Sequence, residues 1–123
     1  MSNATLISKR PRPDTQSTEA LIAPTIVPSE GNVIKRSDAS ANKCEFVLPI
    51  YPGIAKDQKV EAWVATSVGF LIKDIVITSE TVPARVKVDS VAFEGVDTVE
   101  AYYYVLFSSG EEKSLSTTYT IVD

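Results

Sequence analysis

The sequence predicts an all-β fold, an antiparallel β-sandwich of the immunoglobulin type with about seven strands. Two observations support this fold class. Valine, isoleucine and threonine are abundant in the second half of the 123-residue chain, and these β-branched residues favour strands over helices. From residue 32 onward, apolar and polar residues alternate in short runs that turn signals separate, as in sandwich domains. Periodicity alone leaves a β-barrel open as the alternative.

The alternating runs define the expected elements and their inward faces. Strands are expected at 33–36, 43–48, 59–66, 70–78, 84–88, 98–108 and 114–122. One helical turn is expected at 89–94. Since successive side chains of a strand point to opposite faces, alternation also predicts the core. The expected core residues are Phe46, Leu48, Val86, Val88, Val99, Ala101, Tyr103, Val105 and Phe107.

Strand 59–66 is ambiguous in this respect. One of its faces carries Val60, Ala62 and Val64. The other face carries Trp63, whose large apolar area is costly to leave in water. We therefore expect Trp63 in the interior.

Residues 1–31 have the composition of an extended N-terminal arm, and residues 32–123 form the predicted sandwich domain. The arm holds four of the seven prolines, which favour extended or polyproline-like conformations over helix. Residues 1–40 carry a net charge of +1 and residues 41–123 a net charge of −5, so the N-terminal third of the chain is slightly basic and the rest is acidic. The apolar stretch 20–28 is suited to dock as an edge strand, either on its own domain or on a neighbouring subunit.

The composition argues against catalysis. The chain has no histidine, which removes Ser-His-Asp and Cys-His arrangements and the usual zinc sites. It also has no glycine-rich phosphate loop. The lone cysteine, Cys44, lies near Phe46 on an expected strand and is interpreted as a small buried apolar residue. We therefore expect no enzyme activity, no catalytic or metal-binding residue and no cofactor.

Two groups of residues form the candidate interaction surface. Tyr102 and Tyr104 share the face of strand 98–108 opposite Tyr103, where exposed rings can stack on sugars or anchor a protein. Cross-strand packing of these rings is the alternative interpretation. The second group lies in the arm and combines basic with apolar side chains; its members are Lys9, Arg10, Arg12, Leu21, Ile22 and Ile26. A solvated arm is the alternative there.

The stretch "FVLPIYPGIAKDQKVEAWV", residues 46–64, resembles a repeating immunoglobulin-like module of bacterial, especially pseudomonad, surface and secreted proteins. The residues that carry the resemblance are Tyr51, Pro52, Gly53, Ile54, Asp57, Val60 and Trp63. The later segment "VEAYYYVLFSSGEEKSLSTTYTIVD" is similar to the aromatic strand and Ser/Thr-rich last strand of that module. The chain departs from it at Lys56, where the module commonly has glycine. The resemblance implies a non-catalytic spacer, adhesion or assembly module and no catalytic residue.

These observations favour a structural or interaction protein that acts in assembly or adhesion. Such a protein is a virion, sheath or cell-surface component, or an oligomer formed through arm exchange. A carbohydrate-binding module that uses an exposed tyrosine face is the alternative. The expected partner is protein, through self-association or a larger assembly by the arm. With a net charge of −4, no nucleic-acid partner is expected.

The sequence also bears on location. No run approaches the about 20 apolar residues that span a bilayer, so no membrane insertion is expected. The N-terminus lacks the order of a Sec signal, because its basic residues follow its short apolar stretch. Cytoplasmic synthesis is expected, with incorporation in a particle or export by another route left open.

Overall fold

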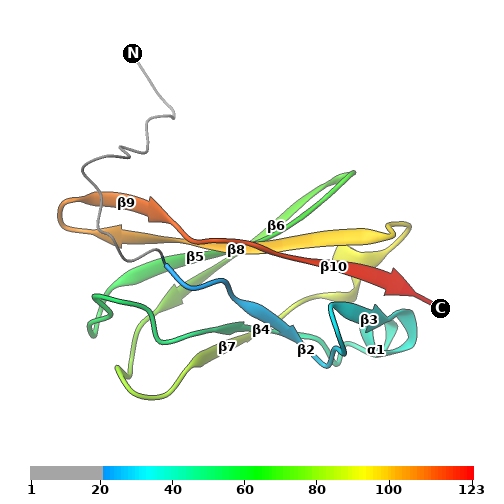
Figure 1. The fold of residues 1–123 in the computed structure, drawn as a ribbon, viewed down its shortest axis with the longest axis horizontal. Coiled ribbons are helices and arrows are strands. Elements are labelled where there is room, and N and C mark those ends of the chain that lie inside the picture. The colour runs from blue at the N-terminus through cyan, green and yellow to red at the C-terminus, as the bar shows by residue number, and fades with distance from the viewer. Residues whose placement is uncertain (1–20) are drawn as a thin grey trace, which may run out of the picture.

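Two β-sheets face each other in the structure, a computed structural model that describes residues 21–123 (Figure 1). The strand order of the larger sheet is β3 (Val33–Lys35), β10 (Thr117–Val122), β8 (Thr98–Phe107), β5 (Lys59–Thr66) and β6 (Gly69–Val76). Strand β9 (Gly110–Lys113) pairs with the C-terminal end of β8. The smaller sheet has the order β2 (Thr25–Val27), β4 (Glu45–Leu48) and β7 (Ala84–Lys87). The predicted all-β sandwich is confirmed.

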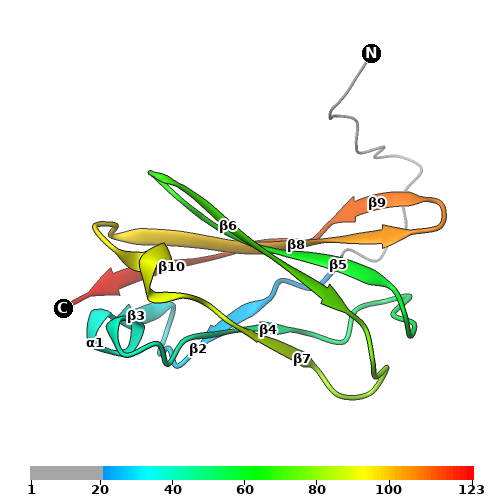
Figure 2. The same ribbon diagram turned by 180° about the vertical axis from the view of Figure 1, so that it is seen from behind.

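The chain crosses between the two sheets directly after its first described strand. Strand β2 pairs antiparallel with β4 in the smaller sheet. After a short turn, β3 pairs parallel with β10 in the larger sheet. The other strand pairs of the described chain are antiparallel. The segment from β6 to β7 crosses back from the larger to the smaller sheet (Figure 2).

The core fills the space between the sheets, and alternation predicts most of it. Strand β8 shows the pattern best, because Val99, Ala101, Tyr103 and Val105 are all buried. From the smaller sheet, Phe46 and Leu48 are buried as expected, and so is Val88 just after β7. Val86 and Phe107, also expected inside, are only partly buried and pack against the edge of this core.

Trp63 is not in the core, and the prediction that placed it there is wrong. Strand β5 turns Val60, Ala62 and Val64 inward, all of them buried. Trp63 lies on the opposite, outer face of the sheet, half-buried against other rings. The regular alternation of an eight-residue strand therefore decides the orientation, and neighbouring aromatic rings, not the core, cover the tryptophan.

Two short helical elements lie at one end of the sandwich: α1 (Arg36–Ser40) and the 3₁₀ turn η2 (Ser90–Phe93). The helical turn expected at 89–94 corresponds to η2. The sequence does not predict α1, because this five-residue helix has neither a side-chain cap nor an apolar stripe, and buries only Ala39. The guanidinium of Arg36 joins both elements, since it donates hydrogen bonds to the carbonyl oxygens of Phe93 and Val96.

The Pro-Gly corner at residues 51–53 is a structural element that follows β4 of the smaller sheet. Gly53 has φ = +85°, and a side chain there would meet the Phe107 ring at 3.4 Å. Gln58 closes the corner, because its side-chain oxygen accepts from the Ala55 N–H at 3.0 Å and its amide nitrogen donates to the Gly53 carbonyl at 2.9 Å. Buried Tyr51 packs below the corner against core rings.

Residues 21–31, part of the stretch assigned to the arm, contribute β2 and two core side chains. Ile26 is fully buried and Leu21 nearly so. The two side chains pack in the same core cluster as Phe46 and Tyr103. The stretch 20–28 was expected to dock as an edge strand, and β2 is an edge strand of the smaller sheet of this same chain. The division of the chain at residue 31 stays a prediction.

Hydroxyl groups of the larger sheet hold this segment in place. The Ile26 N–H donates to the Tyr119 Oη at 2.8 Å, and the Thr117 Oγ1 donates to the Pro24 carbonyl at 2.6 Å. The Tyr103 Oη donates to the Ile22 carbonyl at 2.7 Å. An edge strand has backbone groups with no neighbouring strand to satisfy them. Side chains of the opposite sheet take that role here.

Candidate interaction surface

The outer face of the larger sheet carries a cluster of aromatic and apolar side chains. Strand register brings them together, because Trp63 of β5 lies opposite both Ile72 of β6 and Tyr102 of β8. Ala65, two positions along β5, lies opposite Phe70. We call the set Trp63, Phe70, Ile72, Tyr102 and Tyr104 the aromatic face.

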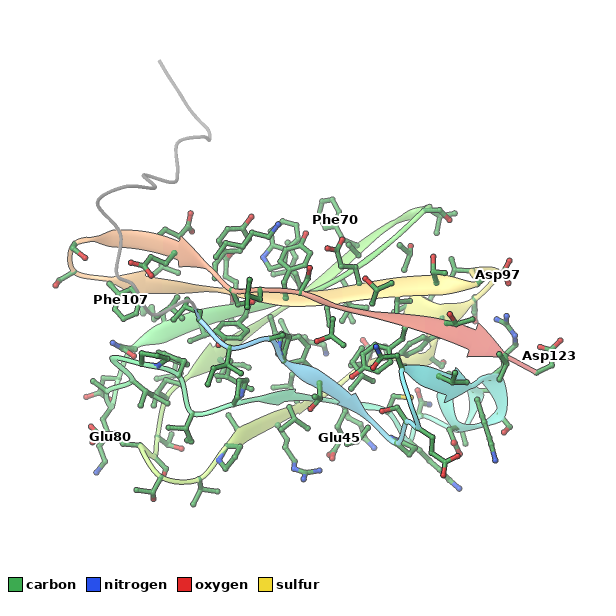
Figure 3. All side chains as sticks on the ribbon, in the orientation of Figure 1. Glu45, Phe70, Glu80, Asp97, Phe107 and Asp123 are labelled. Carbon is green, nitrogen blue, oxygen red and sulfur yellow. The ribbon has the colours of Figure 1, made fainter. Side chains whose placement is uncertain are left out.

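The rings of the aromatic face form one continuous cluster across three strands. Trp63 is its centre, with ring centroids 4.8 Å from Phe70 and 5.7 Å from both Tyr102 and Tyr104. The Trp63 and Tyr102 rings are nearly parallel, at an interplanar angle of 18°. Tyr102 and Tyr104 meet edge to face at 6.0 Å. In Figure 3 the labelled Phe70 stands on the side of the larger sheet that faces away from the smaller sheet.

Much of this apolar surface faces solvent. Phe70 is 63 % exposed and Ile72 is 40 % exposed. Trp63, Tyr102 and Tyr104 are of intermediate exposure. A contiguous exposed patch of large apolar side chains on a small domain typically marks an interaction site, whereas single exposed residues do not.

Carboxylates border the aromatic face. Glu61 of β5 lies directly opposite Asp74 of β6, and its Oε1 accepts a hydrogen bond from the Trp63 indole N–H at 3.2 Å. Glu100 lies along β8 next to Tyr102. Partial burial raises the pKa of Tyr102, and the nearby Tyr104 and Glu100 raise it further. The side of the cluster toward β9 is cationic, because the Lys113 Nζ lies 4.3 Å from the Tyr102 ring centroid.

The structure brings only some of the predicted site residues together. Tyr102 and Tyr104 share the aromatic face, in contact with each other. Leu21 and Ile26 are buried in the core and offer no surface, while Ile22 is about half exposed. The predicted basic residues Lys9, Arg10 and Arg12 lie outside the described residues.

Sequence reasoning missed the β5–β6 half of the surface. It assigned Trp63 to the core and did not assign Phe70 or Ile72 to any site. The signal was present in strand β6, where Phe70, Ile72 and Asp74 alternate with the less exposed Leu71 and Lys73. An apolar outward face on an edge strand is unusual enough to indicate a contact surface.

Cys44 and the carboxylates of residues 21–123 bear on the expectations about metal binding and nucleophilic chemistry. No group of three or more cysteine and carboxylate side chains in residues 21–123 is close enough to hold a metal ion. Cys44 is fully buried, and desolvation, with a smaller contribution from Asp38, raises the pKa of its thiol. A buried thiol with a raised pKa is a poor nucleophile. None of the helices in this part of the chain is long and apolar enough to cross a membrane.

The paired sheets, with the chain crossing between them after β2, define an immunoglobulin-like β-sandwich. Two solved bacterial structures share this fold. A bacterial immunoglobulin-like domain from the M. primoryensis ice-binding adhesin superposes with a TM-score of 0.52 at 12 % identity, covering 85 % of this chain and 99 % of that domain. A structure from work on host cell surface retention of a 1.5-MDa bacterial ice-binding adhesin gives a TM-score of 0.50 at 17 % identity.

This second match covers 88 % of this chain and 34 % of the other, so the chain spans about a third of that structure. At these identities the likeness concerns the fold alone. No protein-family model matches the chain, and neither does any curated protein.

Proposed function

We propose that this domain is a non-catalytic structural and adhesion module that acts by binding protein through the aromatic face. The observation that carries the proposal is the continuous cluster of Trp63, Phe70, Tyr102 and Tyr104 on an otherwise solvated sheet face. Aromatic side chains dominate the energetics of protein interfaces because they bury large areas at small entropic cost. The bacterial immunoglobulin-like domains of similar fold come from adhesins, which supports the same class of role. The motif at the Pro-Gly corner supports a bacterial repeat module of surface or secreted proteins.

The ring geometry favours a protein partner over a carbohydrate. A sugar stacks on a free ring face, but both faces of Tyr102 have neighbours, because Trp63 of β5 stacks from one side and Lys113 of β9 lies over the ring. Strands β5 and β9 flank β8 on opposite sides. Phe70 is the most exposed ring, and it has no polar group to bind a sugar hydroxyl. Carbohydrate binding through Tyr102 and Tyr104 is therefore the second candidate.

Sedimentation of the full chain over a wide concentration range tests protein binding, with a second copy as the partner. We expect the average mass to rise with concentration in the parent chain. The substitutions Phe70→Ser and Ile72→Ser together should abolish the rise, because they remove the most exposed apolar groups of the aromatic face. Val82→Ser with Val91→Ser is the matched control, since those residues are 64 % and 63 % exposed away from this face and should leave the rise unchanged.

A glycan array with the parent chain and a Tyr102→Ala, Tyr104→Ala variant tests the second candidate. Glycan binding by the parent that the variant loses would replace protein binding with carbohydrate binding as the function of this face. A constant mass at every concentration, with no glycan bound, would contradict both.

A further inference from the structure

Within the part of the chain that the structure describes, carboxylates outnumber basic side chains around the aromatic face, because Glu61, Asp74 and Glu100 border it and Lys113 alone lies over one of its rings. Glu61 and Asp74 lie directly opposite each other on neighbouring strands. Two like charges in this arrangement destabilise the strand pair. In residues 21–123, neither Asp74 nor Glu100 takes part in an ion pair. Like-charged carboxylates beside exposed rings are a cost to the isolated domain, and a cation placed over the face would offset that cost.

The chemistry that fits such a surface is an extended segment with both proline and arginine. Aromatic-lined grooves bind proline-rich segments, whose stiff polyproline conformation loses little entropy on binding. Arginine stacks on aromatic rings and pairs with carboxylates through its planar guanidinium. The face offers Trp63 and Phe70 for the first contact, and Glu61, Asp74 and Glu100 for the second.

The same chain contains this chemistry at residues 8–13, "SKRPRP", with Lys9, Arg10 and Arg12 next to two prolines. In a polyproline helix, residues three apart project on the same side, about 9 Å from each other. The Glu61–Asp74 pair and Glu100 are separated by four positions of strand, about 13 Å. The long side chains of lysine and arginine span the difference between these two distances.

The point where the described chain begins allows the segment to reach the face of its own domain. The Leu21 carbonyl accepts a hydrogen bond from the Leu115 N–H, just beyond β9, so Leu21 lies beside the larger sheet. Two strand spacings, about 10 Å, separate Leu21 from β8, which carries Tyr102. Residue 13 precedes Leu21 by eight positions, which span up to about 25 Å in a polyproline conformation. A tether this short gives a millimolar effective concentration, which favours binding within one molecule over exchange between two.

We propose that residues 8–13 of the same chain cover the aromatic face, with Lys9 and Arg12 toward its carboxylates and Pro11 and Pro13 against its rings. This inference rests on the proposed function, because it names the resident occupant that a protein partner displaces. The arm then competes with other partners for the aromatic face. Only partners whose binding outweighs the high local concentration of the arm can associate with that face.

Trp63, the single tryptophan of the chain, reports on the face directly. The test compares acrylamide quenching of its fluorescence in the full chain and in a variant with Lys9→Glu, Arg10→Glu and Arg12→Glu, which we call the reversed-arm variant. We expect the quenching constant to rise about twofold in the variant, because the parent segment occupies the face most of the time. The matched control reverses three exposed lysines of the body by Lys35→Glu, Lys43→Glu and Lys56→Glu, and should quench like the parent.

Two further measurements make the result specific. Adding Asp74→Lys and Glu100→Lys to the reversed-arm variant should restore the parent quenching constant, since the charges are again complementary. A synthetic peptide of residues 6–16 should likewise protect Trp63 of the reversed-arm variant, whereas a peptide with the three charge reversals should not.

The outcome also separates this inference from the proposed function. Protection that is independent of protein concentration, in the dilute range where light scattering shows the chain to be monomeric, supports binding within one molecule. Protection lost on dilution together with a falling mass would show that a second copy, and not the arm of the same chain, covers Trp63, and would overturn the inference. Equal quenching in parent, reversed-arm and control variants would also overturn it, and would leave the sedimentation test of the aromatic face unaffected.

Discussion

Replacing Tyr119 with phenylalanine should destabilise the domain through one buried backbone group. The Tyr119 Oη accepts the Ile26 N–H at 2.8 Å, and both residues are buried. Within residues 21–123, Ile26 sits on the edge strand β2, so no further described strand lies on that side to accept its N–H. The phenylalanine ring keeps the packing but removes the acceptor. A buried donor without a partner costs about 1–3 kcal/mol, and we expect a loss of about 2 kcal/mol.

Urea unfolding followed by circular dichroism measures this loss. The midpoint should fall while the m-value stays constant, and the melting temperature should drop by roughly 5–10 °C for a domain of this size. Hydrogen exchange gives a second, local readout, because the Ile26 amide should exchange faster relative to that of Phe46 on the neighbouring β4.

Tyr103→Phe is the comparison that tests the reasoning. The Tyr103 Oη donates to the Ile22 carbonyl, next to a side chain that is about half exposed. Water can therefore replace the lost donor, and we expect a loss of about 1 kcal/mol or less. A smaller loss for Tyr119→Phe than for Tyr103→Phe, or an unchanged Ile26 amide, would refute the account of β2 as a strand held by hydroxyl groups.

Three further predictions follow from single residues. Burial raises the pKa of Cys44, so its thiol should react with an aromatic disulfide reagent at mildly alkaline pH much more slowly in native protein than in urea. Burial raises the pKa of Tyr51 from 10.0 to about 12, so its contribution to stability should be complete below pH 10 and be lost as the pH rises toward 12; urea midpoints across that range, with phenolate absorbance, measure this. Arg36→Ala removes two hydrogen bonds to carbonyls of the 93–96 turn and the 2.8 Å ion pair with Asp123, and should lower the free energy of unfolding by about 1–2 kcal/mol in urea titrations, whereas Lys35→Ala should change it little.

The sequence predicts the regular strands well because their signal is local. The range expected at 59–66 is that of β5, and the alternation in β8 identifies four buried residues correctly. Trp63 was assigned wrongly because the size of one side chain was weighed above the pattern of its strand. Side-chain area indicates that a residue needs cover, but does not indicate whether the core or neighbouring rings provide it.

What the sequence could not show depends on contacts between distant segments. The hydroxyl groups of Tyr119 and Thr117 form hydrogen bonds with the backbone of Ile26 and Pro24, more than ninety positions earlier in the chain. No local pattern predicts such a pairing. The aromatic face likewise exists only once β5, β6 and β8 are in register. The sequence indicates single residues such as Tyr102 as candidates, whereas the cluster that contains them is visible only in the structure.

The parallel pairing of β3 with β10 also determines how the domain responds to a pulling force. The described chain enters beside β9 and leaves at Asp123, at opposite ends of the sandwich (Figure 1). Tension between these ends pulls β3 toward its N-terminal side and β10 toward its C-terminal side, in opposite directions along one shared ladder. The hydrogen bonds of that ladder are then loaded in shear together instead of opening one after another. A domain connected in this way resists stretching along its long axis more than peeling from one end.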